Sequence, residues 1–573
     1  MTAMSERWAD AYRTFTWDAS FQALGWSPDG GANLGHTIVD RHRASGRVAL
    51  RWFGKDGAVR HVSFEELAEA TDRFANLLRM LGVGPGERVA GFLPRIPETL
   101  VAMLGTWKLG AVYVPIFTGF GPEAIGYRVE HSGARVLCTQ WEHRSRVPAP
   151  FAGGAKVVTV GHRGSSTYQR VGGAGSVGVT ASVDAAASAD DIDFDDAMAA
   201  QSDRFELARC RRDNPAVLLY TSGSTGPPKG VKIATNFVLA VHPYMRYAVD
   251  LRPDDVFWPT GDPGWGYGLV CYMTALALGV PVVSLEAAPA PELCLERLSA
   301  LGVTNLATTP TVLRGIMALG DERVRRHPVR LRCASSCGEP LNAEVVTFFQ
   351  RVWGVTVMDQ YGSSEFGLPI GNFNALEMAV KPGSMGLPLP GCRMAVVDDD
   401  GREVGPDTVG HVGMWPSETG YYALGYWEDP ERTRELTRGG WMTIGDLARR
   451  DRDGYFWFEG RADDVIKSAG YRIGPFEVES AILTHPAVAE AAVVGKADRL
   501  RGQIVKAYVV VKPGMAVRPG LGDEIVEIVK RRAGRHQAPR EVEFVEQLPK
   551  TESGKIQRFR LRGQGEETWR ATR

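Results

Sequence analysis

The stretch from Pro263 to Leu285 constrains the fold more than any other part of this sequence, because it carries no formal charge. Its length is enough in principle to span a bilayer. Gly279 and Pro281 interrupt it, however, and divide it into a short apolar helix and a VVSL strand. A fully apolar strand is typical of a parallel sheet that helices cover on both faces. We therefore predict a buried helix and strand of an α/β protein here, and no membrane span.

An alternation of strands and helices along the chain supports this α/β prediction. From Val48 to about Thr139, helical stretches alternate with short apolar strands, and Gly and Pro turns separate them. The same rhythm returns at Ala216–Tyr220, Val280–Leu285 and Val355–Met358. The sequence therefore predicts a large N-terminal domain with doubly wound sheets. Such sheets bind ligands at the carboxyl ends of their strands.

The later part of the chain has a different texture. After about Gly386, short strands and turns predict a small β-rich subdomain, and from Val465 onward the pattern becomes a compact α+β one. We place the domain boundary at residue 460, which gives an N-terminal domain over 1–460 and a small mobile C-terminal domain over 461–573. The segment 162–190 is rich in Gly, Ser, Ala and Val and has no helical or strand period. We expect a mobile surface insertion there.

Composition excludes several classes of function. The 573 residues include 66 Lys and Arg against 67 Asp and Glu, and the formal charge of −1 provides no global field for nucleic acid or an anionic membrane. The seven cysteines are odd in number and form no CxxC pair, so they fit neither a disulfide framework nor a zinc ribbon and indicate reduced thiols. The N-terminus carries charges every few residues and no apolar core. A cytoplasmic location is therefore expected.

A loop dense in hydroxyls and glycines follows the apolar strand that ends at Tyr220. It runs from Thr221 to Gly230 and contains one lysine, Lys229. Accessible backbone N–H groups, Ser and Thr hydroxyls and a lysine charge are together what a polyphosphate needs. It is not a Walker A loop, because Lys229 is preceded by proline and followed by glycine. The loop therefore predicts a phosphate site but excludes a P-loop kinase or ATPase.

This loop resembles the phosphate loop of the adenylate-forming enzymes, which include acyl- and aryl-CoA synthetases, luciferases and the adenylation domains of peptide synthetases. Other segments resemble the remaining motifs of that family and follow in the family's order: Ser336–Pro340, Asp359–Glu365, Ile444–Leu447, Gly460–Glu479 and Leu548–Ile556. The resemblance covers roughly Val48 to Arg560. It implies that ATP activates a carboxylic acid as an enzyme-bound acyl-adenylate.

The resemblance also implies a nucleotide site. Asp446 would accept hydrogen bonds from both ribose hydroxyls, since a carboxylate has two acceptor oxygens for a vicinal diol, and Arg461 would also reach the nucleotide. Glu365 and Thr225 would hold Mg²⁺, which prefers hard oxygen ligands. Ser364 and Ile444 stand where the family has threonine, and neither departure removes these roles. The other implied ATP and AMP contacts are Thr221, Ser222, Gly223, Ser224, Thr225, Gly226, Gly338, Glu339, Pro340, Asp359, Gln360, Tyr361, Gly362, Ser363 and Ser364.

Three charged residues carry the implied catalysis: Lys229, Glu365 and Lys555. Lys555 would bridge the carboxylate of the acid and the α-phosphate, because two anions must approach each other and a preorganised cation stabilises that transition state most. Asp463 stands where the family places its interdomain hinge. The C-terminal domain would bring Lys555 to the site and then rotate to withdraw it.

Three further stretches are similar to acetyl-CoA and medium-chain acyl-CoA synthetases, which make a CoA thioester: Leu34–Trp52, Val114–Phe120 and Asp498–Ala507. The resemblance points to four contacts with CoA: Ser468, Gly470, Arg472 and Arg501. The basic run Lys530–Arg532 is a further candidate for the 3′-phosphate, although such a run is usually a solvated helix face. Read without the resemblance, Glu477 and Glu479 are also typical of a solvated helix face.

One departure from the family pattern bears on the acyl pocket. Acetyl-specific relatives place a tryptophan where this chain has Gly362. The loss of an indole there should open a deeper apolar slot, in which each buried methylene adds about 0.8 kcal/mol. The expected walls are Trp265, Gly266, Tyr267, Cys337 and Gly362 itself. We expect the substrate to be propionate or a longer acid, up to medium-chain or aryl acids.

Other functions stay open at this stage. The acyl group could pass to a carrier protein instead of CoA, although no carrier segment follows the C-terminal motif. Acetate or an aryl acid could be the substrate. A non-catalytic nucleotide-binding or acyl-sensing protein on the same fold is a third alternative, against which the intact Lys555, Glu365 and Asp446 argue. The sequence does not predict the oligomeric state.

Overall fold

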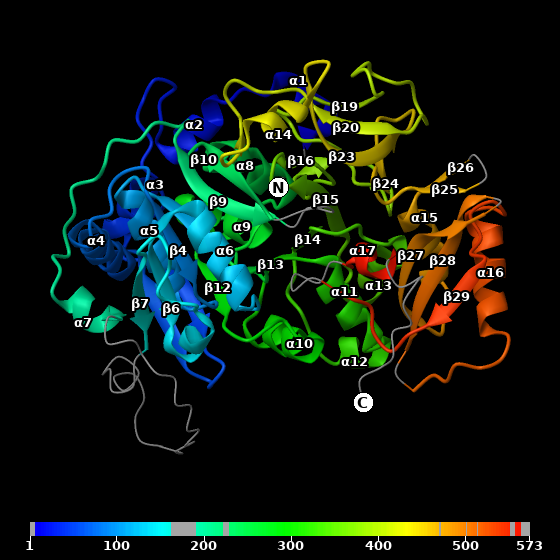
Figure 1. Cartoon of the computed structure of the whole chain (residues 1–573), viewed down its shortest axis with the longest axis horizontal. Coiled ribbons are helices and arrows are strands. Elements are labelled where there is room, and N and C mark those ends of the chain that lie inside the picture. Colours follow the sequence, from blue (N-terminus) through cyan, green and yellow to red (C-terminus); the bar gives the residue numbers. More distant parts are fainter. Residues whose placement is uncertain are drawn as a thin grey trace.

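Figure 1 shows the computed structural model of the whole chain. It describes residues 6–161, 191–221, 228–468, 471–499, 501–512, 514–550 and 556–562. The insertion expected at 162–190 therefore lies outside the described residues. So do seven of the predicted site residues: Ser222, Gly223, Ser224, Thr225, Gly226, Gly470 and Lys555.

The first large sheet contains most of the strands that the N-terminal alternation predicts. Within the described ranges it has eight strands, in the order β21 (Ala423–Tyr426), β10 (Lys229–Ala234), β9 (Pro215–Thr221), β5 (Val112–Pro115), β4 (Arg88–Phe92), β6 (Ala134–Gln140), β7 (Lys156–Val160) and β8 (Ile192–Asp193). Strands β4 to β9 run parallel, whereas β10 and β21 are antiparallel additions at one edge. The predicted phosphate loop thus connects two antiparallel neighbouring strands near this edge.

The second large sheet holds the later motifs. Its nine described strands lie in the order β18 (Leu387–Pro388), β16 (Gly367–Gly371), β15 (Val357–Ser363), β14 (Cys333–Cys337), β13 (Asn305–Thr308), β11 (Phe257–Pro259), β12 (Val282–Leu285), β2 (Val48–Phe53) and β3 (Val59–Ser63). The central strands are parallel, and β3, β16 and β18 are antiparallel edge additions. Parallel strands place the ends of β13, β14 and β15 side by side, where the motifs predict a site.

Helices connect and cover the strands: α4 (Phe64–Met80), α5 (Pro97–Lys108), α6 (Pro122–Ser132), α8 (Phe237–Pro243), α9 (Gly266–Ala277), α10 (Pro291–Ala300), α11 (Pro310–Ala318) and α13 (Ala343–Trp353). Helix α4 begins with a capping box, in which Ser63 and Glu66 each accept a hydrogen bond from the other's backbone N–H. The shorter helices are α1 (Trp8–Thr14), α2 (Asp18–Leu24), α3 (Leu34–Ile38), α7 (Phe194–Ala199), α12 (Asp321–Arg325) and α14 (Pro430–Glu435).

The uncharged stretch forms the elements that its sequence predicts. Helix α9 is almost entirely buried and β12 is buried throughout, so the stretch lies in the protein core. Both belong to the largest buried cluster, which also contains residues of α5, α8 and strands of both sheets. Among the described residues, no helix is long and apolar enough to cross a membrane.

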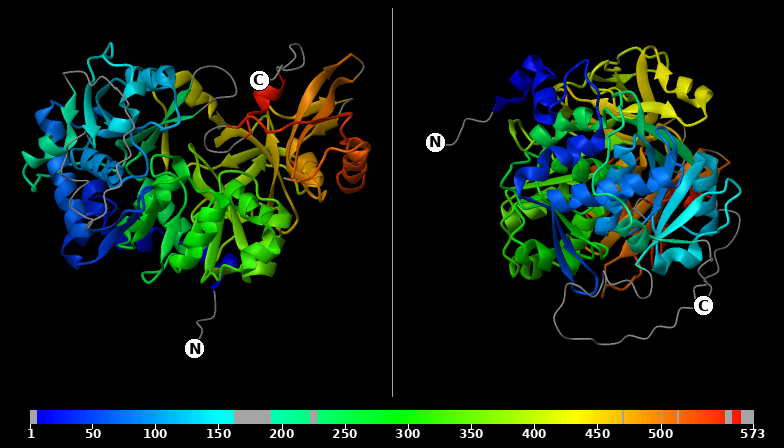
Figure 2. Two further views of the ribbon diagram at one scale, coloured as in Figure 1. Left: turned by 90° about the horizontal axis from the view of Figure 1, so that it is seen from below. Right: turned by 90° about the vertical axis from the view of Figure 1, so that its left-hand side faces the viewer.

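Two smaller units complete the fold. The expected β-rich subdomain is a sheet of β19 (Met394–Val397), β20 (Gly410–Met414), β23 (Trp441–Arg450), β22 (Thr437–Arg438) and β24 (Phe456–Arg461). The C-terminal unit has a sheet of β26 (Tyr471–Ile473), β25 (Ile466–Ser468), β28 (Gly502–Val511), β27 (Val488–Asp498) and β29 (Glu541–Phe544), with α15 (Pro475–Leu483), α16 (Leu521–Arg532) and α17 (Arg558–Arg562). Figure 2 shows this unit and the first sheet at opposite ends of the long axis.

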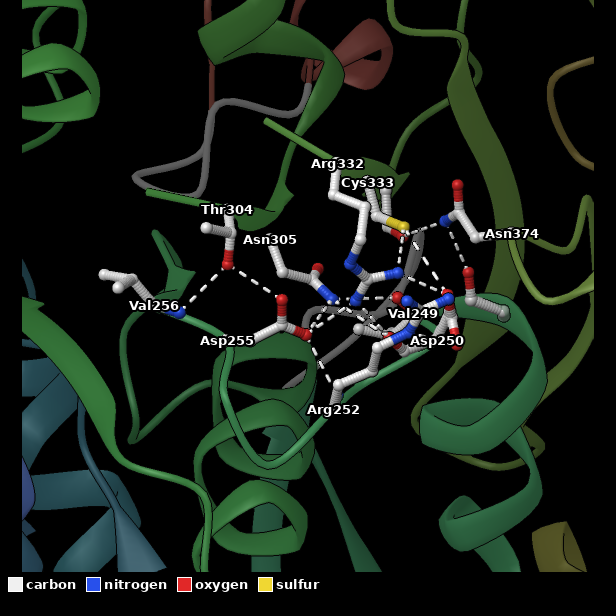
Figure 3. A network of polar contacts seen from close by, with 12 residues as sticks. Val249, Asp250, Arg252, Asp255, Val256, Thr304, Asn305, Arg332, Cys333 and Asn374 are labelled. Carbon is white, nitrogen blue, oxygen red and sulfur yellow. Dashed lines mark hydrogen bonds and ion pairs between the residues drawn. The ribbon is translucent and has the colours of Figure 1, made fainter. Parts of the chain in front are cut away.

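A network of polar contacts ties together the amino ends of three strands of the second sheet (Figure 3). The Arg332 guanidinium, just before β14, donates to Asp255 Oδ2 at 2.7 Å and also pairs with Asp250. Asp255, just before β11, accepts further hydrogen bonds from Thr304 at 2.8 Å and from Asn305 at 3.1 Å, at the start of β13. These bonds fix the register of the strands whose other ends carry the predicted site.

Candidate active site

The phosphate loop joins two paired strands. Thr221 at the end of β9 lies opposite Lys229 at the start of β10, so the predicted loop begins and ends at neighbouring positions. Aromatic residues of α6 support both sides of it. The Tyr127 hydroxyl donates to the Pro228 carbonyl at 3.1 Å, and His131 shares a hydrogen bond of 2.8 Å with the Tyr220 hydroxyl. The hairpin therefore holds Lys229 in place relative to the sheet edge.

Lys229 and Glu365 meet at a tyrosine that no motif predicted. The Lys229 ammonium lies 4.9 Å from the centre of the Tyr426 ring, and the Tyr426 hydroxyl donates to Glu365 Oε1 at 2.9 Å. Burial lowers the pKa of Lys229, and the negative charge of Glu365 opposes that shift. The arrangement places a cation and a carboxylate beside the end of the glycine loop.

Glu365 lies in the turn between β15 and β16. The Ser363 hydroxyl oxygen accepts hydrogen bonds from the backbone N–H groups of Glu365 and Phe366 at 3.2 and 3.0 Å, which fixes the turn. No group of three or more His, Cys, Asp or Glu in the described part of the chain could hold a metal ion by itself. A single half-buried carboxylate suits Mg²⁺, because this ion commonly uses one or two carboxylates together with substrate phosphates and water. Glu365 fits that role, whereas Thr225 lies outside the described residues.

The predicted ribose carboxylate is well held. The Tyr361 hydroxyl donates to Asp446 Oδ2 at 2.7 Å, and the Arg461 guanidinium donates to Asp446 Oδ1 at 3.3 Å. Burial raises the pKa of Tyr361, and the negative charge of Asp446 adds to that shift. Asp446 and Arg461 are cross-strand partners on β23 and β24. The structure thus brings together three predicted nucleotide residues from two separate sheets.

The segment predicted to lie along the adenine follows β14. Gly338 adopts a positive φ of 103°, a conformation that favours glycine. Glu339 accepts hydrogen bonds of 2.7 and 2.9 Å from the Thr311 hydroxyl and also pairs with Arg314, both on α11. Pro340 follows directly. Thr311 and Arg314 escaped the sequence analysis, although the polar residues after the buried strand β13 were a signal that could have revealed them.

Two further predicted nucleotide residues lie on β15, beside β14. Asp359 pairs in register with Ser336, and Gln360 pairs with Cys337. Burial raises the pKa of the Asp359 carboxyl well above its usual range. Asp359 Oδ1, Ser336 Oγ and Gln360 Nε2 are buried and have no hydrogen-bond partner among the described residues.

Three of the expected acyl-pocket walls, Trp265, Tyr267 and Cys337, lie near the Gln360 side chain of β15 or in the core cluster beside it. Tyr267 on α9 shares a hydrogen bond of 3.0 Å with the Tyr244 hydroxyl, which in turn donates to Gln360. Cys337 belongs to the largest buried hydrophobic cluster of the protein. The partly buried Trp265 and Tyr267 pack against this cluster. Gly266 has Leu219 as its nearest neighbour, 3.6 Å from the position of an added Cβ.

The space beside Gly362 is occupied. A Cβ added at Gly362 would lie 2.3 Å from the Gly367 carbonyl oxygen and 2.6 Å from Leu368 Cδ2. The strand β16 and the Leu368 side chain thus take the place that the sequence analysis assigned to an open slot. Leu368 therefore limits the space beside the predicted pocket residue Gly362. The sequence analysis did not predict this leucine as a wall of the pocket.

Two of the predicted CoA residues, Ser468 and Arg472, lie on the paired strands β25 and β26, Arg501 precedes β28, and Gly470 lies outside the described residues. Ser468 on β25 pairs with Gly502, the residue next to Arg501, and also with Tyr471, the residue next to Arg472. The basic run Lys530–Arg532 ends α16, and its last two residues are exposed, as expected of a solvated helix face.

The two glutamates of α15 differ from each other. Glu477 is exposed, as its sequence pattern predicts, but Glu479 is buried, so the expectation of a solvated face is wrong there. Glu479 accepts hydrogen bonds from the Arg558 guanidinium at 2.7 to 3.0 Å and from the Val493 N–H at 2.8 Å. Its charge is therefore satisfied inside the C-terminal unit, by an arginine that follows the last motif.

The predicted hinge residue lies beside the nucleotide site. The Arg461 guanidinium donates to Asp463 Oδ1 at 3.4 Å, and Arg562 of α17 donates to the Asp463 carbonyl at 2.8 Å. Helix α17, which follows the last motif, thus contacts the predicted hinge position.

Comparison with known proteins identifies the family. The model of the AMP-binding enzyme family matches residues 39–427, more than half of the chain, and that of the AMP-binding enzyme C-terminal domain matches residues 477–555. The chain belongs to the AMP-binding enzyme family. Acetyl-coenzyme A synthetase of Bacillus subtilis (strain 168) is 36% identical over 564 residues, which cover 96% of this chain and 94% of that relative.

Solved structures of the AMP-binding enzyme family have the same fold. An acyl-CoA synthetase of Brucella canis has 40% sequence identity and a TM-score of 0.76, covering 98% of this chain and 99% of its own. The anthranilate CoA ligase AuaEII in complex with anthranoyl-AMP has 28% identity and a TM-score of 0.81, covering 93% and 97%. The predicted family and the α/β fold class are confirmed.

Proposed function

We propose that this enzyme, an AMP-forming acyl-CoA ligase like its full-length relatives, activates propionate or a longer carboxylic acid. The observation that carries the proposal is the convergence of Lys229, Glu365 and the Tyr361–Asp446 pair, with Glu365 close enough to influence both Lys229 and Tyr361. A phosphate cation, a hard metal ligand and a diol acceptor at one place are what Mg-ATP requires.

In the first step the acid's carboxylate attacks the α-phosphate, which forms the acyl-adenylate and releases pyrophosphate. Lys229 would hold the outer phosphates, and Asp446 would hold the ribose while Tyr361 and Arg461 orient its oxygens. Mg²⁺ bound at Glu365 would neutralise phosphate charge. Lys555 would stabilise the charge that develops between the two anions. No protein nucleophile is needed.

In the second step the CoA thiol attacks the acyl-adenylate and AMP leaves. We propose that rotation of the C-terminal domain about Asp463 withdraws Lys555 and presents the β25–β26 hairpin with Ser468, Gly470 and Arg472, while Arg501 binds the nucleotide part of CoA. The short pairing between Ser468 and Gly502 would let these groups act together. Free thiols at all seven cysteines support a cytoplasmic location.

The length of the acid depends on Leu368 rather than on an open slot at Gly362. Leu368 fills the space beside the glycine, and its side chain is 9% exposed. Without an indole, the flexible end of this leucine is the barrier between the acyl carbons and the core. We propose that it admits short to medium chains, with the longest of them limited by its volume.

A panel of acids from acetate to dodecanoate, with benzoate and phenylacetate, tests this proposal through pyrophosphate release. The wild type should prefer propionate or a longer acid, and Leu368→Ala should move the optimum to longer chains by about 0.8 kcal/mol per methylene that the new space holds. Leu331→Ala is the matched control, because this leucine is equally buried but lies in a different core cluster. A preference unchanged by Leu368→Ala would contradict the role of this residue.

Acetate is the second candidate substrate, and the activity of several relatives favours it. Several relatives at 33–36% identity are acetyl-coenzyme A synthetases. The same panel separates the two candidates: the highest kcat/KM with acetate would replace the longer acid while leaving the chemistry of the two steps intact.

A further inference from the structure

Tyr426 touches both of the charged groups that the proposed first step requires. It lies on β21 and is 4% exposed. Its hydroxyl donates to Glu365 Oε1 at 2.9 Å, and its ring faces the Lys229 ammonium at 4.9 Å. A ring that carries a cation on its face and a carboxylate on its hydroxyl lies between two opposite charges that attract each other.

The two charges remain unpaired with each other. In the parts of the chain that the structure describes, no ion pair within 4.0 Å joins Lys229 to a carboxylate. Asp429, just before α14, is nevertheless close enough for its charge to raise the pKa of Lys229 slightly. Direct pairing would occupy the lysine that the phosphates need and the oxygens that a metal needs. An arrangement that keeps such groups apart costs stability unless the surrounding structure holds it.

The surrounding structure does hold the tyrosine. Tyr426 pairs with Val231 across the β10–β21 ladder, and its backbone N–H donates to the Thr433 hydroxyl at 2.9 Å. The next residue, Trp427, donates to the Gly230 carbonyl at 2.7 Å, directly beside Lys229. The preceding Gly425 has a φ of 91°, and an added Cβ would lie 2.3 Å from the Thr433 methyl. The backbone here is therefore fixed from both sides.

We infer that Tyr426 is a positioning residue that separates Lys229 from Glu365, so that the ammonium stays available to the polyphosphate and one carboxylate oxygen to the metal. This inference rests on the proposed roles of Lys229 and Glu365. The hydroxyl and the ring of Tyr426 have different roles. The hydroxyl orients the Glu365 carboxylate, and the ring occupies the space through which the Lys229 ammonium would otherwise reach that carboxylate.

Two variants separate these contributions. Tyr426→Phe keeps the ring and removes the hydroxyl, so the Mg²⁺ concentration for half-maximal ATP binding should rise about tenfold or more, as for other partners of metal ligands, while ATP binding without metal stays unchanged. Tyr426→Leu also removes the ring, so Lys229 and Glu365 can pair. ATP affinity should then fall with and without Mg²⁺, while AMP affinity, which needs no outer phosphates, should not change. Calorimetric titration with each nucleotide measures both effects.

A double-mutant cycle and a control complete the test. In a Lys229→Gln background, Tyr426→Leu should cause no further loss of metal-free ATP affinity, because the lysine that would pair is gone. Tyr455→Phe is the control, since Tyr455 is similarly buried and its hydroxyl donates to the Ala379 carbonyl instead of to Glu365. It should leave the Mg²⁺ dependence unchanged.

The results that would overturn the inference differ from those that would overturn the proposed function. A Tyr426→Phe enzyme with a lower Tm and the wild-type Mg²⁺ dependence would make the tyrosine a packing residue only. Full additivity of Tyr426→Leu and Lys229→Gln would contradict the spacer role. A wild-type enzyme that binds ATP without any Mg²⁺ dependence would instead remove the role of Glu365 and, with it, the inference.

Discussion

Two buried aspartates of the second sheet, one at each end of its parallel strands, have different surroundings. Asp255, at the amino end of β11, accepts hydrogen bonds from Arg332, Thr304 and Asn305. Asp359, beside the carboxyl end of β14, accepts a weak bond of 3.4 Å from the Leu341 N–H at Oδ2, and its Oδ1 has no partner in the described ranges. Both oxygens of Asp255 are thus satisfied within the protein, whereas Asp359 keeps one oxygen that a ligand could use.

This difference teaches where function lies on such a sheet. Unsatisfied buried polar groups cost free energy, so a protein keeps them where a ligand can use them. Ser336 and Gln360 are unpartnered beside Asp359, and the carboxyl ends of parallel strands are where α/β sheets bind ligands. The comparison predicts that removal of a polar group at the amino end lowers stability, whereas removal at the carboxyl end changes activity without lowering stability.

The largest expected effect is on the activity side. Lys555→Ala should lower the rate of acyl-adenylate formation by about 10²–10³-fold, since it removes the preorganised charge between two anions, but it should spare thioester formation from a supplied acyl-adenylate. The two half-reactions are measured separately by pyrophosphate release and by CoA consumption. Lys550→Ala is the control, because this nearby lysine pairs with Glu490. Equal loss in both half-reactions would contradict the proposed domain rotation.

The next effect is on stability. Asp255→Ala removes one of the two carboxylates that pair with Arg332 and the acceptor of Thr304 and Asn305, so the free energy of unfolding should fall by about 3 kcal/mol. Urea denaturation measures this loss. The affinity for ATP of the folded protein should not change. A weaker affinity for ATP at unaltered stability would remove the distinction between the two ends of the sheet.

A smaller effect of opposite sign is expected at Asp359. Burial raises its pKa, so the folded protein keeps a proton that the unfolded chain releases above about pH 4. This group therefore destabilises the fold increasingly as the pH rises from about 4 toward the folded pKa, by about 1.4 kcal/mol per pH unit.

Asp359→Asn cannot titrate, so its stability relative to the wild type should increase with pH over this window. Unfolding measured from pH 4 to pH 8 for both proteins gives the difference directly. A difference that does not depend on pH would mean that the Asp359 carboxyl is ionised in the folded protein.

The smallest effect is expected at an exposed ion pair, which serves as a reference for the buried network of Asp255. Glu322 and Arg326 form an exposed pair on the surface, one turn apart. Glu322→Gln should change the free energy of unfolding by less than about 0.5 kcal/mol, because solvent and salt screen such pairs. The same denaturation assay as for Asp255 serves here. A loss comparable to that of Asp255→Ala would show that burial does not separate the two classes of ion pair.

The sequence predicted the parts of the fold that local patterns determine. The uncharged stretch became α9 and β12, and the strands before Thr139 became β4, β5 and β6. The motifs also placed Asp446 and Arg461 correctly beside each other, because each motif is short and its spacing is specific.

The rest depended on contacts between distant segments. Tyr426 reaches Lys229 and Glu365 only because β21 pairs with β10, and Leu368 fills the space beside Gly362 only because β16 folds back on β15. The helical pattern predicted a solvated Glu479, whereas in the structure Glu479 is buried and paired with Arg558. The order of residues along the chain does not specify such neighbours. From the sequence alone, Tyr426 and Leu368 are typical of a core and Glu479 is typical of a surface.

The measurement that tests the central claim most directly is the ratio of pyrophosphate released to CoA thiol consumed, with propionate, butyrate and hexanoate in turn. A CoA ligase that works through an acyl-adenylate should release one pyrophosphate for each thiol that disappears, at every acid that it accepts. Pyrophosphate release without loss of free CoA would contradict the account, since the acyl group would then pass to another acceptor such as a carrier protein.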